Sequence, residues 1–124
     1  MVKKAVLDTS FIISAVGKKI DFFSELELLG FKIFIPREVL FELKGIAEGK
    51  GKKLKFKENA GTALNIIDSS DFEEIILGSK NVDRGILDYE KEEENIFVGT
   101  LDKEMRGKLK GKTILIRGRQ LEVV

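Results

Sequence analysis

The sequence predicts an α/β domain with a mostly parallel central sheet. Short apolar runs typical of strands alternate along the chain with segments whose apolar residues recur at helical spacing, which is the pattern of such a domain. The 124 residues, 43% of them hydrophobic, fit one core, so we expect a single domain over residues 1–124. Neither an internal repeat nor an interdomain linker is visible, and every functional residue is therefore expected on one scaffold.

The predicted strands and helices follow one another in order. Each strand is a short apolar run, bounded in most cases by Gly, Asn, Lys or Asp, and the five runs cover residues 5–7, 33–35, 74–77, 96–98 and 113–116. Each helix is a segment with apolar residues three and four apart, and the five segments cover residues 22–29, 39–47, 60–67, 86–89 and 105–109. Pro36 follows the second strand directly, where its fixed φ suits the first turn of the next helix. The acidic run at Glu90 and residues 92–94 is expected to be a solvated face of the fourth helix.

The residue types that are missing exclude several kinds of site. The sequence has no cysteine and no histidine. This excludes disulfides, thiol nucleophiles, the usual structural zinc sites and catalysis by a Ser-His-Asp triad. The net charge of +1, from 22 basic and 21 acidic residues, neither favours nor opposes a nucleic-acid partner, because only the distribution of charge can do so. Carboxylates, hydroxyls, lysines and the backbone remain for chemistry.

The first residues lead directly into the apolar run of the first strand. No apolar stretch in the sequence is long enough for a secretion signal or a membrane span. We therefore expect a cytoplasmic protein with no membrane partner.

Four carboxylates stand at or beside the ends of apolar runs. Asp8 follows the first strand, Asp83 lies beyond the boundary signal at 78–80, and Asp102 follows the fourth strand. Glu42 lies within the second helix, at the border of its apolar face. In an open parallel sheet, the loops that leave the carboxyl ends of the strands line the ligand-binding crevice. If the four acids converge there, their repulsion requires a hard cation such as Mg²⁺ or Mn²⁺, which oxygen ligands suit.

A purely structural interpretation competes with this metal site. Each aspartate precedes a helical segment, where Asp is a preferred N-cap, so each alone is explained at least as well as a cap. Asp8 is the least ordinary of the three, because Thr9 and Ser10 beside it are competent caps themselves. Glu42 lies inside a helix and cannot be a cap, although an ordinary surface glutamate would also fit its position. The metal interpretation therefore depends on the set of four.

Three segments of the chain resemble, in the same order, the PIN domain ribonucleases, a family named after the PilT N-terminus. The first is Val6 to Ile13, which contains Asp-Thr-Ser, and the second is Pro36 to Leu43, where a proline precedes a helix that carries one glutamate of the set. The third is Asp83 to Ile86, followed by the run from Ile96 to Asp102. The resemblance covers nearly the whole chain. A strand that ends in Asp-Thr is common, whereas the ordered set of four acids is fairly specific.

The resemblance implies a three-layer α/β/α fold and a divalent-metal-dependent endoribonuclease that hydrolyses RNA phosphodiester bonds. The acids that it assigns to catalysis and to binding Mg²⁺ or Mn²⁺ are Asp8, Glu42, Asp83 and Asp102. The hydroxyls that it places behind these ligands are those of Thr9, Ser10 and Thr100. Glu38 and Asp88 match the family spacing less well and rank lower. A metal held in this way lowers the pKa of a bound water, and the resulting hydroxide attacks the phosphodiester.

RNA also needs a basic surface beside the acids. The basic residues that we select as RNA-binding are Lys52 and Lys53 in the lysine-rich stretch 50–57, and Lys103, Arg106, Arg117 and Arg119 toward the C-terminus. Lysine-rich loops are also ordinary soluble surface, so the first group stays open. The second group is the stronger candidate because it begins beside Asp102.

Two biological roles compete within the PIN group. One is ribosomal RNA processing, which the C-terminal segment 114–123 resembles more, and the other is a VapC-type toxin of a toxin–antitoxin system. The implied partners are RNA, a second copy of the chain in a homo-oligomer, and an antitoxin or a ribosome-assembly partner. Outside these roles, a non-catalytic RNA-binding or scaffold module would be expected to have lost one or more of the acids. A two-component receiver domain requires paired acids after the first strand, where this sequence supplies only Asp8.

Overall fold

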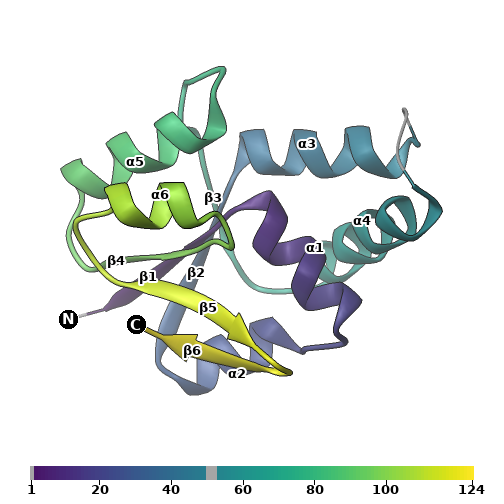
Figure 1. Cartoon of the computed structure of the whole chain (residues 1–124), viewed down its shortest axis with the longest axis horizontal. Coiled ribbons are helices and arrows are strands. Elements are labelled where there is room, and N and C mark those ends of the chain that lie inside the picture. The colour runs from purple at the N-terminus through teal and green to yellow at the C-terminus, as the bar shows by residue number, and fades with distance from the viewer. Residues whose placement is uncertain (1, 50–52) are drawn as a thin grey trace.

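The central feature of the computed structural model is a six-stranded sheet (Figure 1). The structure describes residues 2–49 and 53–124. The strands are β1 (Lys3–Leu7), β2 (Phe31–Pro36), β3 (Glu73–Ile75), β4 (Ile96–Gly99), β5 (Thr113–Arg117) and β6 (Gln120–Val123). They lie in the order β3-β2-β1-β4-β5-β6, and every neighbouring pair is parallel except β5 with β6. The predicted mostly parallel sheet is confirmed, with β1 and β4 in its middle.

Helices cover both faces of this sheet. In the described residues they are α1 (Thr9–Gly17), α2 (Phe22–Leu28), α3 (Arg37–Ala47), α4 (Leu54–Asp68), α5 (Val82–Glu92) and α6 (Lys103–Lys108). The first four helices pack on one face and the last two on the other. This arrangement confirms the three-layer α/β/α fold. Within the described ranges, no helix has both the length and the apolar character needed to cross a membrane.

The middle strands are buried on both faces and divide their side chains between two hydrophobic clusters. Ala5 and Leu7 of β1 pack with the layer of α1 to α4, whereas Val6 between them packs with α5 and α6. All three side chains are fully buried. Burial of a large apolar side chain stabilises a fold by about 1.5–3 kcal/mol. The continuous apolar runs of the sequence are therefore those of central parallel strands.

Helix α1 is absent from the helices that apolar spacing predicts. Its residues Phe11, Ile12 and Ile13 are consecutive, and all three are buried. A helix that is packed on most sides carries apolar residues all round, so it shows no apolar stripe with helical spacing. Its start was nevertheless marked in the sequence, because Asp8 is its N-cap.

Pro36 belongs to the strand and not, as predicted, to the first turn of the helix. It is the last residue of β2 and the N-cap of α3, with φ −63° and ψ 142°. The φ that a proline ring fixes is compatible with both helical and extended backbone, so ψ decides between them. The helix begins at Arg37, and only the position of the boundary beside the proline was predicted correctly.

Strand β3 ends at Ile75, before the predicted limit at residue 77, and a side chain accepts the N–H groups of the segment that follows. The Glu38 carboxylate accepts hydrogen bonds from the backbone N–H of Leu77 at 3.1 Å and of Gly78 at 2.9 Å. Partial desolvation raises the pKa of Glu38, but these N–H groups, its own N–H and the nearby Arg37 outweigh it, so this pKa lies below its usual range. Glu38 thus fastens the segment before α5 to α3.

Glu90 is not part of a solvated face, which corrects the prediction for the acidic run. Its side chain is 1% exposed, and its carboxylate accepts hydrogen bonds from the backbone N–H of Lys110 at 3.2 Å and of Gly111 at 2.6 Å. Glu92 and Glu94 in the same run are exposed, as predicted. The buried carboxylate fastens the turn before β5 to α5.

We expect Glu90→Ala to lower the free energy of unfolding by about 3 kcal/mol, because two N–H groups lose a charged acceptor. Glu92→Ala, on the exposed side of the same helix, is the matched control and should change it by less than about 0.5 kcal/mol. Urea unfolding at pH 7 measures both. Equal effects of the two substitutions would show that Glu90 does not anchor this turn.

Candidate functional site

Four acidic side chains from four separate parts of the chain line one cavity of about 370 Å³. Asp8 follows β1, Glu42 lies midway along α3, Asp83 lies in the first turn of α5, and Asp102 directly precedes α6. The other residues that line this acidic cavity are Thr9, Ser10, Val82 and Leu101. The structure thus brings together all four acids that the sequence analysis grouped.

The topology of the sheet explains why these acids meet. Strands β1 and β4 are parallel neighbours, and Leu7 is in register with Gly99. The pairing extends one residue further, because the Asp8 N–H donates to the Gly99 carbonyl at 3.0 Å. The chain therefore leaves β1 and β4 side by side at the carboxyl ends of the strands, which is where ligands bind in open α/β sheets. Asp8 and Asp102 therefore face one space although 94 residue positions separate them.

Two of the three aspartates are helix caps, and the third is not. Asp8 Oδ1 accepts the N–H of Phe11 at 2.9 Å, and Asp102 Oδ1 accepts the N–H of Glu104 at 2.9 Å. Asn81 caps α5, so Asp83 lies inside that helix and the cap interpretation is wrong for it. In both aspartate caps Oδ1 alone takes the helix N–H groups, and Oδ2 is left outside the cap. Capping a helix and binding a ligand are therefore compatible roles for one carboxylate.

Asp8 is the most perturbed acid of the cavity. Its side chain is 5% exposed. Desolvation by burial raises its pKa from 3.8 to about 6, although the Thr100 hydroxyl, the Phe11 N–H and the Ser10 hydroxyl each lower it; the charge of Asp83 raises it further. A carboxyl group with this pKa is ionised at pH 7 and above, and its burial in the ionised form lowers the stability of the fold.

The acids also repel one another across the cavity. Desolvation raises the pKa of Asp83, and so do the charges of Asp102 and Glu104, while Lys108 lowers it. Among the described residues that line the acidic cavity, none is basic. The cavity therefore carries negative charge that its own lining does not neutralise.

Hydroxyl groups contact the acids of the cavity. Thr9 Oγ1 donates a hydrogen bond to Glu42 Oε1, which links the start of α1 to the middle of α3. Thr100 is fully buried, and its hydroxyl accepts the Asp102 N–H at 3.1 Å and hydrogen bonds to Asp8. These contacts restrict where the carboxylates of Glu42 and Asp8 can point.

The chemistry of this donor set suits a hard divalent cation. Carboxylate oxygens are the protein ligands that Mg²⁺ and Mn²⁺ prefer, and a cation would offset the repulsion among the acids. Within the part of the chain that the structure describes, no group of three or more acidic side chains is already arranged to hold one ion. The residues fit such an ion by type and charge.

The C-terminal basic residues selected from the sequence do not line the acidic cavity. Lys103 and Arg106 lie on α6, directly after Asp102. Arg117 ends β5 and pairs with a glutamate of β6 at 2.6 Å, and Arg119 lies in the turn between the two strands. Their role in binding RNA stays a prediction.

The lysine-rich group lies elsewhere. Lys53 is the N-cap residue of α4 and is exposed, but it does not line the acidic cavity. Lys52 lies outside the described residues. For both lysines, RNA binding stays a prediction.

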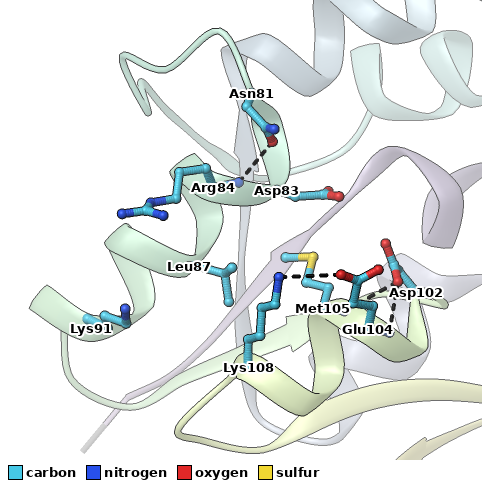
Figure 2. Close-up of a pocket in the computed structure, with 9 residues that line it drawn as sticks. All are labelled: Asn81, Asp83, Arg84, Leu87, Lys91, Asp102, Glu104, Met105 and Lys108. Carbon is cyan, nitrogen blue, oxygen red and sulfur yellow. Dashed lines mark hydrogen bonds and ion pairs between the residues drawn. The ribbon is translucent and has the colours of Figure 1, made fainter.

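A second cavity of about 750 Å³ adjoins the acidic cavity and shares Asp83 and Asp102 with it. It lies between α5 and α6, and we call it the α5–α6 groove; Figure 2 shows its lining residues, which are Asn81, Asp83, Arg84, Leu87, Lys91, Asp102, Glu104, Met105 and Lys108. Of its three cations, Arg84 and Lys91 were not selected as RNA-binding in the sequence analysis. These two lie seven residues apart and so share one face of α5, a spacing that was visible in the sequence.

Comparison with known proteins identifies the family. The chain matches the family described as a PIN like domain over residues 5–120. Ribonuclease VapC4 of Methanocaldococcus jannaschii is 34% identical over an alignment of 109 residues, and the match covers 86% of this chain and 82% of the relative.

Two solved structures share the fold. The PIN domain endonuclease Utp24 superimposes with a TM-score of 0.77 at 21% identity, over 97% of this chain and 90% of that one. VapBC2 from Rickettsia felis, bound to a DNA fragment from their promoter, superimposes with a TM-score of 0.54 at 23% identity, over 89% of this chain and 98% of that one. At these identities the structures support the fold alone. The match over residues 5–120 and the VapC4 relative show the family, and the receiver-domain alternative is excluded: this chain belongs to the PIN-like domain family.

Proposed function

We propose that this protein is a divalent-metal-dependent endoribonuclease whose active site is the acidic cavity. The observation that carries the proposal is that Asp8, Glu42, Asp83 and Asp102, from four distant parts of a PIN-like chain, line one cavity. A relative of 34% identity that is named a ribonuclease supports RNA as the substrate. A non-catalytic scaffold would have no need for this costly concentration of charge.

In this proposal, the four carboxylates hold Mg²⁺ or Mn²⁺ through their oxygens. When bound, the ion lowers the pKa of a water and neutralises charge that develops on the phosphoryl oxygens. The protein contributes the positions of the carboxylates: the Phe11 N–H orients Asp8, and Thr9 orients Glu42. A cavity without a cation would repel the phosphate backbone, so the cation binds before RNA or together with it.

The biological role that sequence kinship supports is that of a VapC-type toxin, with an antitoxin as partner, because the 34% identical relative is named Ribonuclease VapC4. The processing role is favoured only by the C-terminal segment of the sequence, since the likeness to the endonuclease Utp24 at 21% identity concerns the fold alone. Its partner would be a ribosome-assembly protein. A homo-oligomer is compatible with either role, and cytoplasmic localisation stays part of the proposal.

We expect the purified protein to cleave RNA with Mn²⁺ or Mg²⁺, and chelation of the metal to stop the cleavage reversibly. Asp8→Asn and Glu42→Gln should each lower the rate at least about 100-fold, since loss of residues that only support a metal ligand already costs 10–100-fold. Asp68→Asn at the end of α4 and Glu48→Gln at the end of α3 change the same groups on exposed positions outside the cavity, and should leave the rate unchanged. Gel analysis of diverse labelled RNAs measures cleavage, and circular dichroism checks folding. Full activity of Asp8→Asn, or no cleavage by the wild type with either metal, contradicts the proposal.

We expect Asp8→Asn to stabilise the protein above pH 6 and not at pH 4. The folded-state pKa of Asp8 is raised from 3.8 to about 6, so its contribution is fully present below pH 4 and is lost as pH rises through 6. A shift of this size corresponds to about 3 kcal/mol, which sets the upper limit of the gain at pH 8. Asn keeps an oxygen that can cap α1. Urea unfolding of variant and wild type at pH 4 and pH 8 gives the difference, and a gap that does not widen with pH refutes the burial argument.

The two roles predict different RNA ends in cells. A toxin should arrest growth when produced without its antitoxin, and new 5′ ends should appear within mature RNA only with active protein. Sequencing of 5′ ends from cells that make the wild type or Asp8→Asn tests this. The processing role predicts the opposite pattern. Depletion of the protein should leave ribosomal RNA precursors uncut and slow growth, and its overproduction should not arrest growth.

A further inference from the structure

The α5–α6 groove differs in charge from the acidic cavity that it adjoins. The acids Asp83 and Asp102 stand at the end that the two cavities share, and in Figure 2 they lie at the opposite end of the groove from Arg84 and Lys91. The third cation, Lys108, reaches into the groove from α6. The groove thus leads from the acids at the shared end, with Glu104 and Lys108 beside them, to Arg84 and Lys91 at the other end.

The cations of the groove are available to a ligand. Arg84 pairs with Asp88 at 3.3 Å, and Lys108 pairs with Glu104 at 3.5 Å; in each pair both side chains are more than half exposed, and the partners lie four residues apart on one helix. Such pairs stabilise a helix by only about 0.3–0.5 kcal/mol, so a phosphate can displace them at little cost. Lys91 makes no ion pair within the described residues.

The spacing of the cations suits an extended chain of phosphates. Arg84 and Lys91 are seven residues apart on α5, which places their backbones about 10 Å apart along the helix axis. Lys108 approaches from the other wall of the groove. Three cations distributed in this way meet different phosphates of one strand, as in grooves that follow a nucleic-acid backbone.

The floor of the groove is apolar between the acids and the cations. Leu87 and Met105 are 9% and 2% exposed, belong to the hydrophobic cluster under α5 and α6, and line the groove. The apolar face of a base can contact the exposed part of Leu87 only if the base is unpaired, because the bases of a duplex present only their edges. The floor therefore favours a single strand.

From these observations we infer that the α5–α6 groove binds a single-stranded RNA segment next to the bond that is cut. The phosphates of this segment contact Arg84, Lys91 and Lys108, and the face of a base contacts the exposed part of Leu87. Asp83 and Asp102 line both cavities, so the strand passes from the groove to the acids without leaving the surface. The inference rests on the proposed function, which supplies the cut bond in the acidic cavity.

Salt dependence of binding tests the inference. The probe is a fluorescently labelled single-stranded RNA, and the background is Asp8→Asn with Mg²⁺ present, so that cleavage does not deplete the RNA. We expect the triple variant Arg84→Ala, Lys91→Ala, Lys108→Ala to bind at least 10-fold more weakly. The slope of log affinity against log salt should fall by about 2, because each phosphate contact on a single strand contributes about 0.7. A duplex of the same sequence should compete at least 10-fold more weakly than the single strand.

The matched control removes three lysines from other surfaces. Lys3, Lys18 and Lys32 line neither cavity, and their replacement by alanine removes the same charge. The affinity of this variant for RNA should stay within twofold of the parent's, and its salt slope should stay within 0.5 of the parent's. A groove variant that binds like the control, or a duplex that competes as well as the single strand, overturns the inference. Lys91→Ala alone serves if the triple variant fails to fold.

Cleavage assays separate this inference from the proposed function. If the wild type cleaves RNA and the groove variant cleaves and binds equally well, the groove assignment fails and the function stands. If the wild type cleaves nothing but the groove variant loses affinity and salt slope, the groove stands and the catalytic proposal fails.

Discussion

The acidic cavity depends on one constraint, which is that the parallel strands β1 and β4 end side by side. The hydrogen bond from the Asp8 N–H to the Gly99 carbonyl at 3.0 Å fixes this geometry. A Cβ at position 99 would lie 2.9 Å from Leu7 Cδ2 and 3.2 Å from Phe11 Cγ, so a glycine lets β4 end this close to α1. Once both strands end there, the acids that follow them share one space, and α3 and α5 only have to add one carboxylate each.

An ionised carboxylate buried in this position lowers the stability of the fold, and the packing of the surrounding layers compensates for the loss. Asp8 is 5% exposed and lies between Leu7 and the α1 residues Phe11 and Ile12, all of which are fully buried. Apolar surroundings disfavour the ionised form of a carboxyl group, and the neighbouring acids disfavour it further. Functional sites commonly break such local rules while the rest of the fold compensates. Here the compensation comes from strands that are packed on both faces, which leave Asp8 little freedom to turn toward solvent.

The sequence was informative wherever a local pattern decides the structure. Asp8 and Asp102 could be identified because each follows the end of a predicted strand. In a parallel sheet the carboxyl ends of the strands lie on the same side. Where the deciding partner comes from far along the chain, the sequence failed. Glu90 looks like a member of an exposed acidic run, and only the turn at residues 110–111 makes it a buried acceptor. The groove is a similar case, since Arg84 gains its meaning from α6, which packs against α5 about 20 residues later.

Hydrogen bonding, and not charge or burial, distinguishes the structural carboxylates of this protein from the candidate functional ones. Glu38 and Glu90 each use both oxygens on backbone N–H groups, one set before α5 and the other before β5, and so are consumed in holding loops. Asp8 and Asp102 use only Oδ1 to cap their helices. Their second oxygens lie outside the caps, on side chains that line the acidic cavity. The cap therefore orients the carboxylate through Oδ1 and does not use Oδ2, so capping a helix and binding a cation are compatible in one aspartate.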